Sequence, residues 1–327
     1  MPYTDHALDV PEQTAVAAAA ASAPSVLNAQ PWLFATGPDA VEVRADPLRA
    51  PTGTASAERD VYLSCGAALF TVRAALARLG REVRVSVLPE ARDPLLVARV
   101  AVTGDGGDPA AAALYRWVGE RRTNRHPFRP EPVPAGVFTL LRGAAEREGA
   151  TLRRLDAEPE YQRVLTLIRR ASLTEDDAVR EDRAARLTAG TPAVPVENLG
   201  PVPRREGRDG DTAVRDLAPG LGLPGRGTAA FEPHPELAVL ETPQDSPASW
   251  IAAGQALQRL LLEATGHGVA ASFANQPLED ADLRADVSSS AAHFGHPQMV
   301  LRLGYPLTRP PAAPRRPQHE VLRRVGR

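Results

Sequence analysis

The chain has 327 residues, of which 43% are hydrophobic, enough for two domains of ordinary size or for one fold built twice. Its 38 basic and 40 acidic residues nearly cancel, so no overall charge favours nucleic acid or an anionic membrane as a partner. The single cysteine, Cys65, excludes a disulfide framework or a thiolate metal cluster within one chain.

We expect a cytoplasmic protein. No apolar run is long enough to span a bilayer, and residues 1–10 lack the charged and apolar regions of a signal peptide.

The first third of the chain alternates between the two regular structures. Leu69, Val72 and Leu76 recur on one helical face, while Val83 and Val85 alternate as in a strand. Helices are predicted at 9–23, 61–79 and 110–120, and strands at 33–36, 40–44, 83–87 and 95–102.

A polar loop follows the first helix, with the sequence Pro-Ser-Val-Leu-Asn-Ala-Gln-Pro-Trp over residues 24–32. Ser25 and Asn28 sit on a loop that prolines hold stiff at both ends, so they could present hydrogen bonds to a planar heteroaromatic ring. The same residues fit a helix C-cap and turn equally well.

An arginine run, Arg-Arg-Thr-Asn-Arg-His-Pro-Phe over residues 121–128, places three guanidinium groups and a hydroxyl within five residues. Arginine can bind a phosphate through two parallel hydrogen bonds, and threonine adds a hydroxyl. The run therefore predicts an anion site between two helices. The alternative is a solvated basic helix end, which the helix dipole also favours.

The rest of the chain repeats the alternation around one irregular segment. Helices are predicted at 133–148, 159–171, 174–187 and 252–264, and strands at 151–155, 237–242 and 299–303. Residues 188–228 are rich in Pro, Gly and Arg and have no sustained period, which indicates a long loop or lid, or else plain disorder. A Pro-rich tail carries Arg315 and Arg316.

Other motifs carry less chemistry. Residues 220–225 fit Gly-x-Gly-x-x-Gly, but no strand precedes them and Pro224 opposes a following helix. His293 and His296 lack the Glu or Cys of a metal site, and Cys65 is expected to be packed rather than reactive. We find no catalytic triad or carboxylate pair.

A repeat connects the two strongest helices. Gly66-Ala-Ala-Leu69 matches Gly254-Gln-Ala-Leu257 at an offset of 188 residues, and the same offset brings Gly80 onto Gly268. Helices of this composition also coincide by chance. If the repeat is real, the arginine run and the polar loop each lack a counterpart in the other copy, so each half holds one part of a site.

These motifs together resemble FMN-dependent nitroreductases, in the fused, two-copy actinobacterial branch related to dormancy-associated, flavin-sequestering proteins. The family pattern Arg-Arg/His-Ser-x-Arg/Lys-x-Phe, followed by Pro-Val-Pro, is similar to residues 121–135, with Thr123 in place of serine. The family segment Ala-Pro-Ser-x-x-Asn-x-Gln-Pro-Trp stands unchanged at residues 23–32, and residues 270–279 and 297–306 are similar to segments of the fused branch.

The resemblance implies an α+β fold of nitroreductase type, built from two related halves that form a pseudo-dimer within one chain. The halves would be residues 1–118 and residues 119–327, the second with a lid-like insert at 188–228 that replaces the short connector of the family. Whether the fused chain pairs further is left open.

The resemblance also assigns one FMN site. Its phosphate and ribityl chain would be held by Arg121, Arg122, Thr123 and Arg125, with a further basic residue from Arg315 or Arg316. Ser25 and Asn28 would contact the flavin from the other half, and the backbone around Asn275 and Gln276 would face the ring.

Two functions follow from this resemblance. The first is an oxidoreductase in which NADPH or NADH reduces the flavin, which then passes two electrons to a nitroaromatic or quinone-like acceptor. The second is a flavin-binding protein in which the insert covers FMN and little or no turnover occurs. A purely structural helical scaffold would leave both polar motifs without a role.

Overall fold

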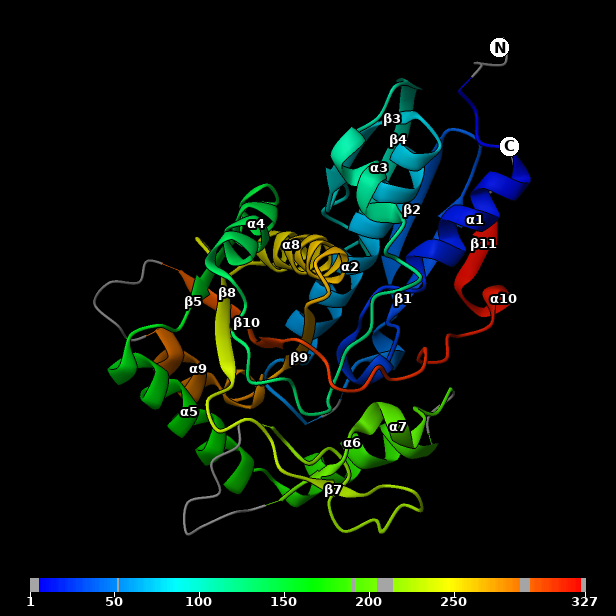
Figure 1. Ribbon diagram of the computed structural model, residues 1–327. Helices are drawn as coiled ribbons and strands as arrows, with labels where there is room; N and C mark the ends of the chain where they lie inside the picture. The colour runs from blue at the N-terminus through cyan, green and yellow to red at the C-terminus, as the bar shows by residue number, and fades with distance from the viewer. Residues whose placement is uncertain (1–5, 52, 190–191, 205–213, 289–294, 325–327) are drawn as a thin grey trace.

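The computed structural model describes residues 6–51, 53–189, 192–204, 214–288 and 295–324 (Figure 1). Two β-sheets lie on either side of a central pair of long helices. The α+β class expected from the sequence is confirmed.

The first sheet combines the N-terminal strands with one strand from the C-terminal end. Its order is β11 (Leu322–Arg324), β1 (Trp32–Thr36), β2 (Ala40–Ala45), β4 (Leu96–Asp105) and β3 (Arg81–Val87). Neighbouring strands are antiparallel, except that β11 pairs in parallel with β1.

The second sheet is antiparallel throughout. Its order is β5 (Thr151–Arg154), β8 (Glu236–Thr242), β10 (His296–Gly304) and β9 (Ala270–Phe273). The two sheets therefore share one strand order. If the strands of each sheet are numbered along the chain and β11 is set aside, both sheets have the order 1-2-4-3. A small parallel pair, β6 (Val202–Pro203) and β7 (Thr228–Ala229), lies apart from both sheets.

Helices cover the sheets on several faces (Figure 1). They are α1 (Val10–Ala20), α2 (Ala57–Arg78), α3 (Pro109–Tyr115), α4 (Ala135–Glu146), α5 (Glu158–Leu173), α6 (Asp177–Ala189), α7 (Val196–Leu199), α8 (Pro247–Gly266), α9 (Ala281–Ser288) and α10 (Gln318–Val321). Three 3₁₀ turns lie at Val26–Asn28, Pro47–Arg49 and Gln276–Leu278. Asp9 and Glu12 close a capping box at the start of α1, as their spacing allows.

The alternation of side chains explains how each sheet is covered. On β8, Ala238 and Leu240 pack with α4 and α8, whereas Leu237 and Val239 pack with α5 and α9, so both faces are buried. The first sheet buries one face against α1 and α2. Its other face carries ion pairs such as Arg99 with Glu42.

The two central helices cross at a pair of glycines. A Cβ atom on Gly66 of α2 would lie 2.2 Å from the backbone oxygen of Ile251, and one on Gly254 of α8 would lie 2.1 Å from that of Leu63. The offset of 188 that aligns Gly66 with Gly254 also aligns Leu63 with Ile251, so the two contacts are reciprocal. Only glycine permits the backbones to approach this closely.

Helix α2 is also long and apolar enough to cross a membrane by length and composition alone. In this fold, however, 89% of its most apolar window is buried inside the protein, as in a core helix. The feature is therefore weak evidence for a membrane span.

Three segments differ from the sequence-based expectation. The segment 188–228, expected as a long loop or lid, or else as disorder, carries α7, β6 and β7 in its described parts. The helix expected over 110–120 ends at Tyr115 and gives way to turns that lead into the arginine run. The tail does not end as a coil, because α10 and β11 carry residues of the 119–327 segment onto β1, in the sheet of the 1–118 segment. A tail that joins a distant sheet edge leaves no local periodic signal.

The glycine crossing yields a stability prediction. Gly66→Ala should lower the free energy of unfolding by about 1–3 kcal/mol, because the added methyl group has no space against the backbone of α8. Gly143→Ala in α4 is the matched control, since nothing lies within 4 Å of the added atom, and it should be neutral or stabilise by up to about 1 kcal/mol. Urea denaturation measures both, and equal effects would contradict the crossing.

Candidate functional site

Two adjoining cavities lie where the polar loop, the arginine run and the C-terminal tail meet. The first, which we call the anion cavity, has a volume of about 160 Å³, and the second, the apolar cavity, has about 130 Å³. Pro24, Ser25 and Arg125 line both cavities, which therefore adjoin each other. A ligand with one charged end and one apolar end would fit this division.

The anion cavity gathers most of the site residues expected from the sequence. It is lined by Ser25, Asn28, Arg121, Arg122, Thr123, Arg125 and Arg315, among others. These residues come from three segments that are far apart in the chain: the loop after α1, the run after α3 and the tail.

The polar loop holds a strained backbone. Leu27, Asn28 and Gln30 have φ of 46°, 56° and 53°, in the left-handed region that side chains seldom adopt. Arg315 Nη1 donates to Asn28 Oδ1 at 2.5 Å, and the backbone nitrogen of Arg316 donates to Gln30 Oε1 at 2.8 Å. The tail thus fixes the loop and brings Arg315 to the cavity.

The second sheet holds the arginine run in place. Asn124 N donates to the carbonyl oxygen of Ala271 on β9 at 2.8 Å. Further along, the buried Arg302 of β10 donates to His126 O at 3.1 Å and stacks 3.9 Å from the ring centroid of Phe128. The run is therefore an ordered segment rather than a frayed helix end.

The guanidinium groups in this cavity have no carboxylate partner within the part of the chain that the structure describes. Among the residues that the structure describes, no carboxylate forms an ion pair with Arg121, Arg125 or Arg315. Arg121 is only 6% exposed, and its Nε and Nη1 atoms are buried without a hydrogen-bond partner within the described ranges. Buried charges are normally paired, so this donor set fits an anionic ligand such as a phosphate.

The pKa values of these arginines are lowered mainly because their charges are buried, and in part because positive charges are gathered here. Burial, with the repulsion of Arg315, Arg122 and Arg125, lowers the pKa of Arg121 to about 9. Burial lowers the pKa of Arg125 to about 10, and burial together with Arg122 lowers that of Arg315 to about 10. An anion would reverse these shifts because it favours the charged forms.

Arg316 takes a different place from the one the resemblance implied. It does not line either cavity; its guanidinium instead forms ion pairs with Asp46 and Glu320 and bonds to the carbonyl oxygen of Gln30. Of the two tail arginines, the structure brings Arg315 to the anion cavity and uses Arg316 to anchor the tail.

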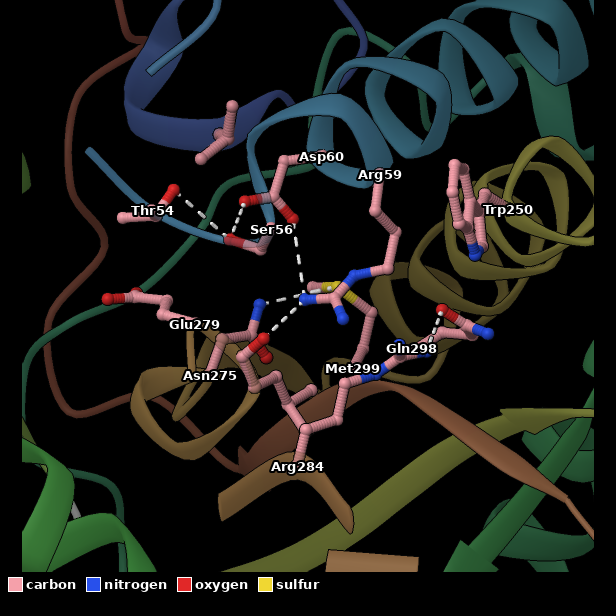
Figure 2. A network of polar contacts seen from close by, with 12 residues as sticks. Thr54, Ser56, Arg59, Asp60, Trp250, Asn275, Glu279, Arg284, Gln298 and Met299 are labelled. Atoms are coloured by element: carbon pink, nitrogen blue, oxygen red, sulfur yellow. Dashed lines mark hydrogen bonds and ion pairs between the residues drawn. The ribbon is translucent and has the colours of Figure 1, made fainter. Parts of the chain in front are cut away.

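The apolar cavity lies between the start of α2 and the end of β9. Its apolar lining consists of Val26, Leu27, Leu63, Val214, Leu217, Leu257, Phe273 and Met299. Figure 2 shows Arg59 and Asp60 at the start of α2, with Asn275 and Met299 facing Arg59 across this region. Such a surface with a few convergent polar groups is typical of a site for a planar ring.

Asn275 and Gln276 both line the apolar cavity, but their side chains are largely occupied. Asn275 Oδ1 accepts from the backbone nitrogen of Val300 at 2.9 Å, and its Nδ2 lies 3.3 Å from Met299 Sδ. Gln276 is 3% exposed and points its Nε2 toward Ser172 at 3.5 Å. These bonds order the turn that leaves β9.

Arg59 and Asp60 belong to the site although the sequence analysis did not single them out. Arg59 Nη2 donates to Leu278 O at 2.7 Å, while its buried Nε has no hydrogen-bond partner among the described residues. Asp60 Oδ2 accepts from Ser56 Oγ at 2.8 Å, and burial raises the pKa of this carboxyl to about 6. The sequence offered one signal for these two residues, namely that an arginine and an aspartate stand side by side at the start of a largely apolar helix.

The insert also contributes to both cavities. Val194 and Asn198 line the anion cavity, whereas Val214, Arg215 and Leu217 line the apolar cavity. Arg215 bonds both carboxylate oxygens of Glu279, at 2.8 and 3.0 Å, and Glu175 Oε1 at 2.7 Å. Composition alone carried no signal that these residues reach the site.

The minor motifs remain outside this chemistry. Within the described part of the chain, no group of three His, Cys, Asp or Glu residues could hold a metal ion. Cys65 is fully buried, which raises the pKa of its thiol, and residues 220–225 lie in a loop of turns and irregular backbone. His296 is exposed at the start of β10, and His293 lies outside the described residues.

Comparisons place the chain near a group of mycobacterial proteins. It is 31% identical over 304 residues to a Mycobacterium tuberculosis protein named "Putative NAD(P)H nitroreductase Rv3131", covering 90% of this chain and 86% of the relative. It is 27% identical over 319 residues to the protein named "Putative NAD(P)H nitroreductase acg" of that organism, covering 93% and 92%. No family model matches the chain.

Solved structures match only distantly. The nitroreductase NfnB of Mycobacterium smegmatis, described as FMN-dependent and in complex with NADPH, gives a TM-score of 0.40 at 18% identity and covers 67% of this chain and all 100% of its own. A nitroreductase with bound FMN from Bacteroides fragilis gives 0.37 at 15% identity, covering 59% of this chain and 87% of its own. Scores at this level carry no argument about this chain.

The unpaired cation at Arg121 predicts an unusual stability effect. Arg121→Leu should stabilise the ligand-free protein by about 1–3 kcal/mol, because it removes a buried charge that has no partner. Arg302→Leu is the contrasting control: that arginine is buried but paired with Glu232, so its loss should cost about 3–5 kcal/mol. Urea denaturation of ligand-free protein compares them, and a large loss in both would mean that Arg121 is structural.

The raised pKa of Asp60 predicts a pH dependence. The folded protein keeps a proton up to pH of about 6 that the unfolded chain releases near its ordinary value of 3.8, so stability falls as pH rises through that window. Asp60→Asn removes this loss, and the stability advantage of the variant should grow between about pH 4 and pH 6 and level off above that, at a limit of about 3 kcal/mol. Thermal unfolding across this range measures it, and a pH-independent difference would contradict the shift.

Proposed function

The chain belongs to the nitroreductase family, and we propose that it is an FMN-binding, NAD(P)H-dependent oxidoreductase that reduces nitroaromatic or quinone-like acceptors by two electrons. The observation that carries this proposal is the group of arginines around the buried Arg121, which form no ion pair with a carboxylate of the described residues, in a cavity that adjoins an apolar one. FMN has the same division, with a phosphate at one end and a planar ring at the other.

In this proposal the anion cavity takes the phosphate. Arg121, Arg122, Arg125 and Arg315 supply charged donors, and Thr123 and Ser25 supply hydroxyls. Asn28 completes the wall, held by its bond to Arg315. The lowered pKa values of Arg121, Arg125 and Arg315 support the assignment, because an anion offsets the cost of burying their charges.

The apolar cavity takes the ring. FMN, when bound, supplies the redox chemistry, by accepting a hydride from a nicotinamide and passing two electrons to the acceptor. Arg59, whose Nε has no hydrogen-bond partner among the described residues, would offer a donor to the ring, and the turn at Asn275 and Gln276 would border it. Asp60, in the same cavity, keeps a proton at its carboxyl only below pH of about 6, so near neutral pH it is a carboxylate beside Arg59.

A second candidate function rests on the insert. Arg215 is fixed to Glu279 and Glu175 by three hydrogen bonds, and with Val214 and Leu217 it walls the apolar cavity. A wall held by ion pairs could exclude the nicotinamide and the acceptor while retaining the flavin. In that case the protein would store or withhold FMN with little turnover.

We further propose that the chain belongs to the fused, two-copy branch of the family and acts as a pseudo-dimer. The matching strand orders of the two sheets and the reciprocal contacts of Gly66 and Gly254 support this proposal. The passage of β11 into the first sheet supports it as well, because exchanged terminal segments are a common way of joining two copies.

An anaerobic absorbance spectrum tests the function. The purified protein, reconstituted with FMN, should show a flavin band that NADPH or NADH bleaches and that an added nitroaromatic or quinone restores. Arg121→Ala should weaken FMN binding about tenfold or more through the loss of charge-assisted bonds.

The alternatives give other spectra. A bound flavin that neither nucleotide bleaches would favour sequestration. If Glu279→Gln, which weakens the bond to Arg215, then made the flavin reducible, the insert would be the barrier. Failure to bind FMN at all would contradict both functions.

A further inference from the structure

Helix α7, a single turn within the insert, is docked on the arginine run. Arg125 Nη1 donates to the backbone oxygen of Asn198 at 2.8 Å. Nε2 of the His126 ring lies 2.7 Å from the backbone oxygen of Glu197, within hydrogen-bonding distance. Arg125 is one of the residues shared by both cavities, so α7 lies beside the junction between them.

Gly200 shows how closely this segment approaches. Its φ is +72°, and an added Cβ atom would lie 2.3 Å from the backbone oxygen of Arg125. No other residue type would fit there without displacing one of the two segments. The position of α7 relative to the run is therefore set by backbone contact.

The side chain of Asn198 lines the anion cavity and is only 4% exposed. Its Nδ2 donates to Pro311 O in the tail at 2.8 Å, which fixes the orientation of the amide. The other amide atom, Oδ1, is buried and has no hydrogen-bond partner in the part of the chain described. A buried acceptor without a donor is costly, so a ligand donor would offset that cost.

The two ends of a phosphate ester differ in what they can offer Asn198 Oδ1. The arginines that line it can bind a phosphate, but a phosphate monoester above its second pKa of about 6 has no hydrogen to donate to Oδ1. A hydroxyl group has one, and it can accept from an arginine at the same time.

We propose that Asn198 accepts a hydrogen bond from a hydroxyl of a polyol chain attached to the phosphate. The site is thereby specific for phosphate esters of polyhydroxy chains, rather than for phosphate alone. This inference rests on the proposed function, in which that chain is the ribityl group of FMN. It assigns a binding role to a residue of the insert, not only to the two polar motifs.

The test pairs a protein variant with an altered ligand. Flavin fluorescence titration gives Kd for FMN and for a flavin phosphate whose linking chain is an unsubstituted pentyl group. Wild-type protein should bind FMN about tenfold more tightly, because one buried hydrogen bond is worth about that much in Kd. The Asn198→Leu variant should bind the two ligands with Kd values within about twofold of each other. Asn198→Ala, which adds no bulk, serves as a second variant.

Gln258→Leu is the matched control. Gln258 is also a buried amide, with Nε2 donating to Thr71 Oγ1 at 3.0 Å and Oε1 without a partner among the described residues, but it lines neither cavity, so its loss should leave the preference for FMN intact. A wild-type protein without the preference, or an Asn198 variant that keeps it, overturns the inference while FMN binding stands. Failure of wild-type protein to bind either flavin overturns the proposed function, and the inference with it.

Discussion

The close crossing of α2 and α8 sets the distance between the two sheets. Because Gly66 and Gly254 bring one backbone against the other, the sheets are held on either side of a thin helical layer. Residues of both helices, Leu63 from α2 and Leu257 from α8, then line one cavity together with the end of β9. The apolar part of the site thus exists only because the helices meet at this depth.

Two buried arginines of this fold differ in whether a carboxylate is paired with them. Arg302 is buried, but Glu232 pairs with it and Phe128 stacks on it, so it stabilises the fold that carries the arginine run. Arg121 is also buried, but it has no such partner among the described residues. A fold that retains this cost gives up stability for a site that an anion completes.

The insert contributes side chains to both cavities. Its two described stretches lie on different parts of the ligand cavity, Asn198 at the anionic end and Arg215 at the apolar end. Side chains placed there can add specificity for the ligand or exclude a second substrate. The oxidoreductase and the flavin-retaining protein differ in whether this wall opens, which is a matter of kinetics rather than of the residues that bind FMN.

The sequence by itself determined the elements and the two polar motifs. Apolar periodicity is local, so it revealed α2, α8 and the strands β1 to β5, β8 and β10, but not β6, β7, β9 or β11. The chemistry of Arg121 and Ser25 pointed to an anion and a ring. Only the tertiary structure decided which tail arginine enters the cavity, and that Arg59, Asp60 and Asn198 line it. Those placements depend on contacts between segments more than 70 residues apart, such as Arg125 with Asn198 and Arg315 with Asn28, which no local pattern encodes.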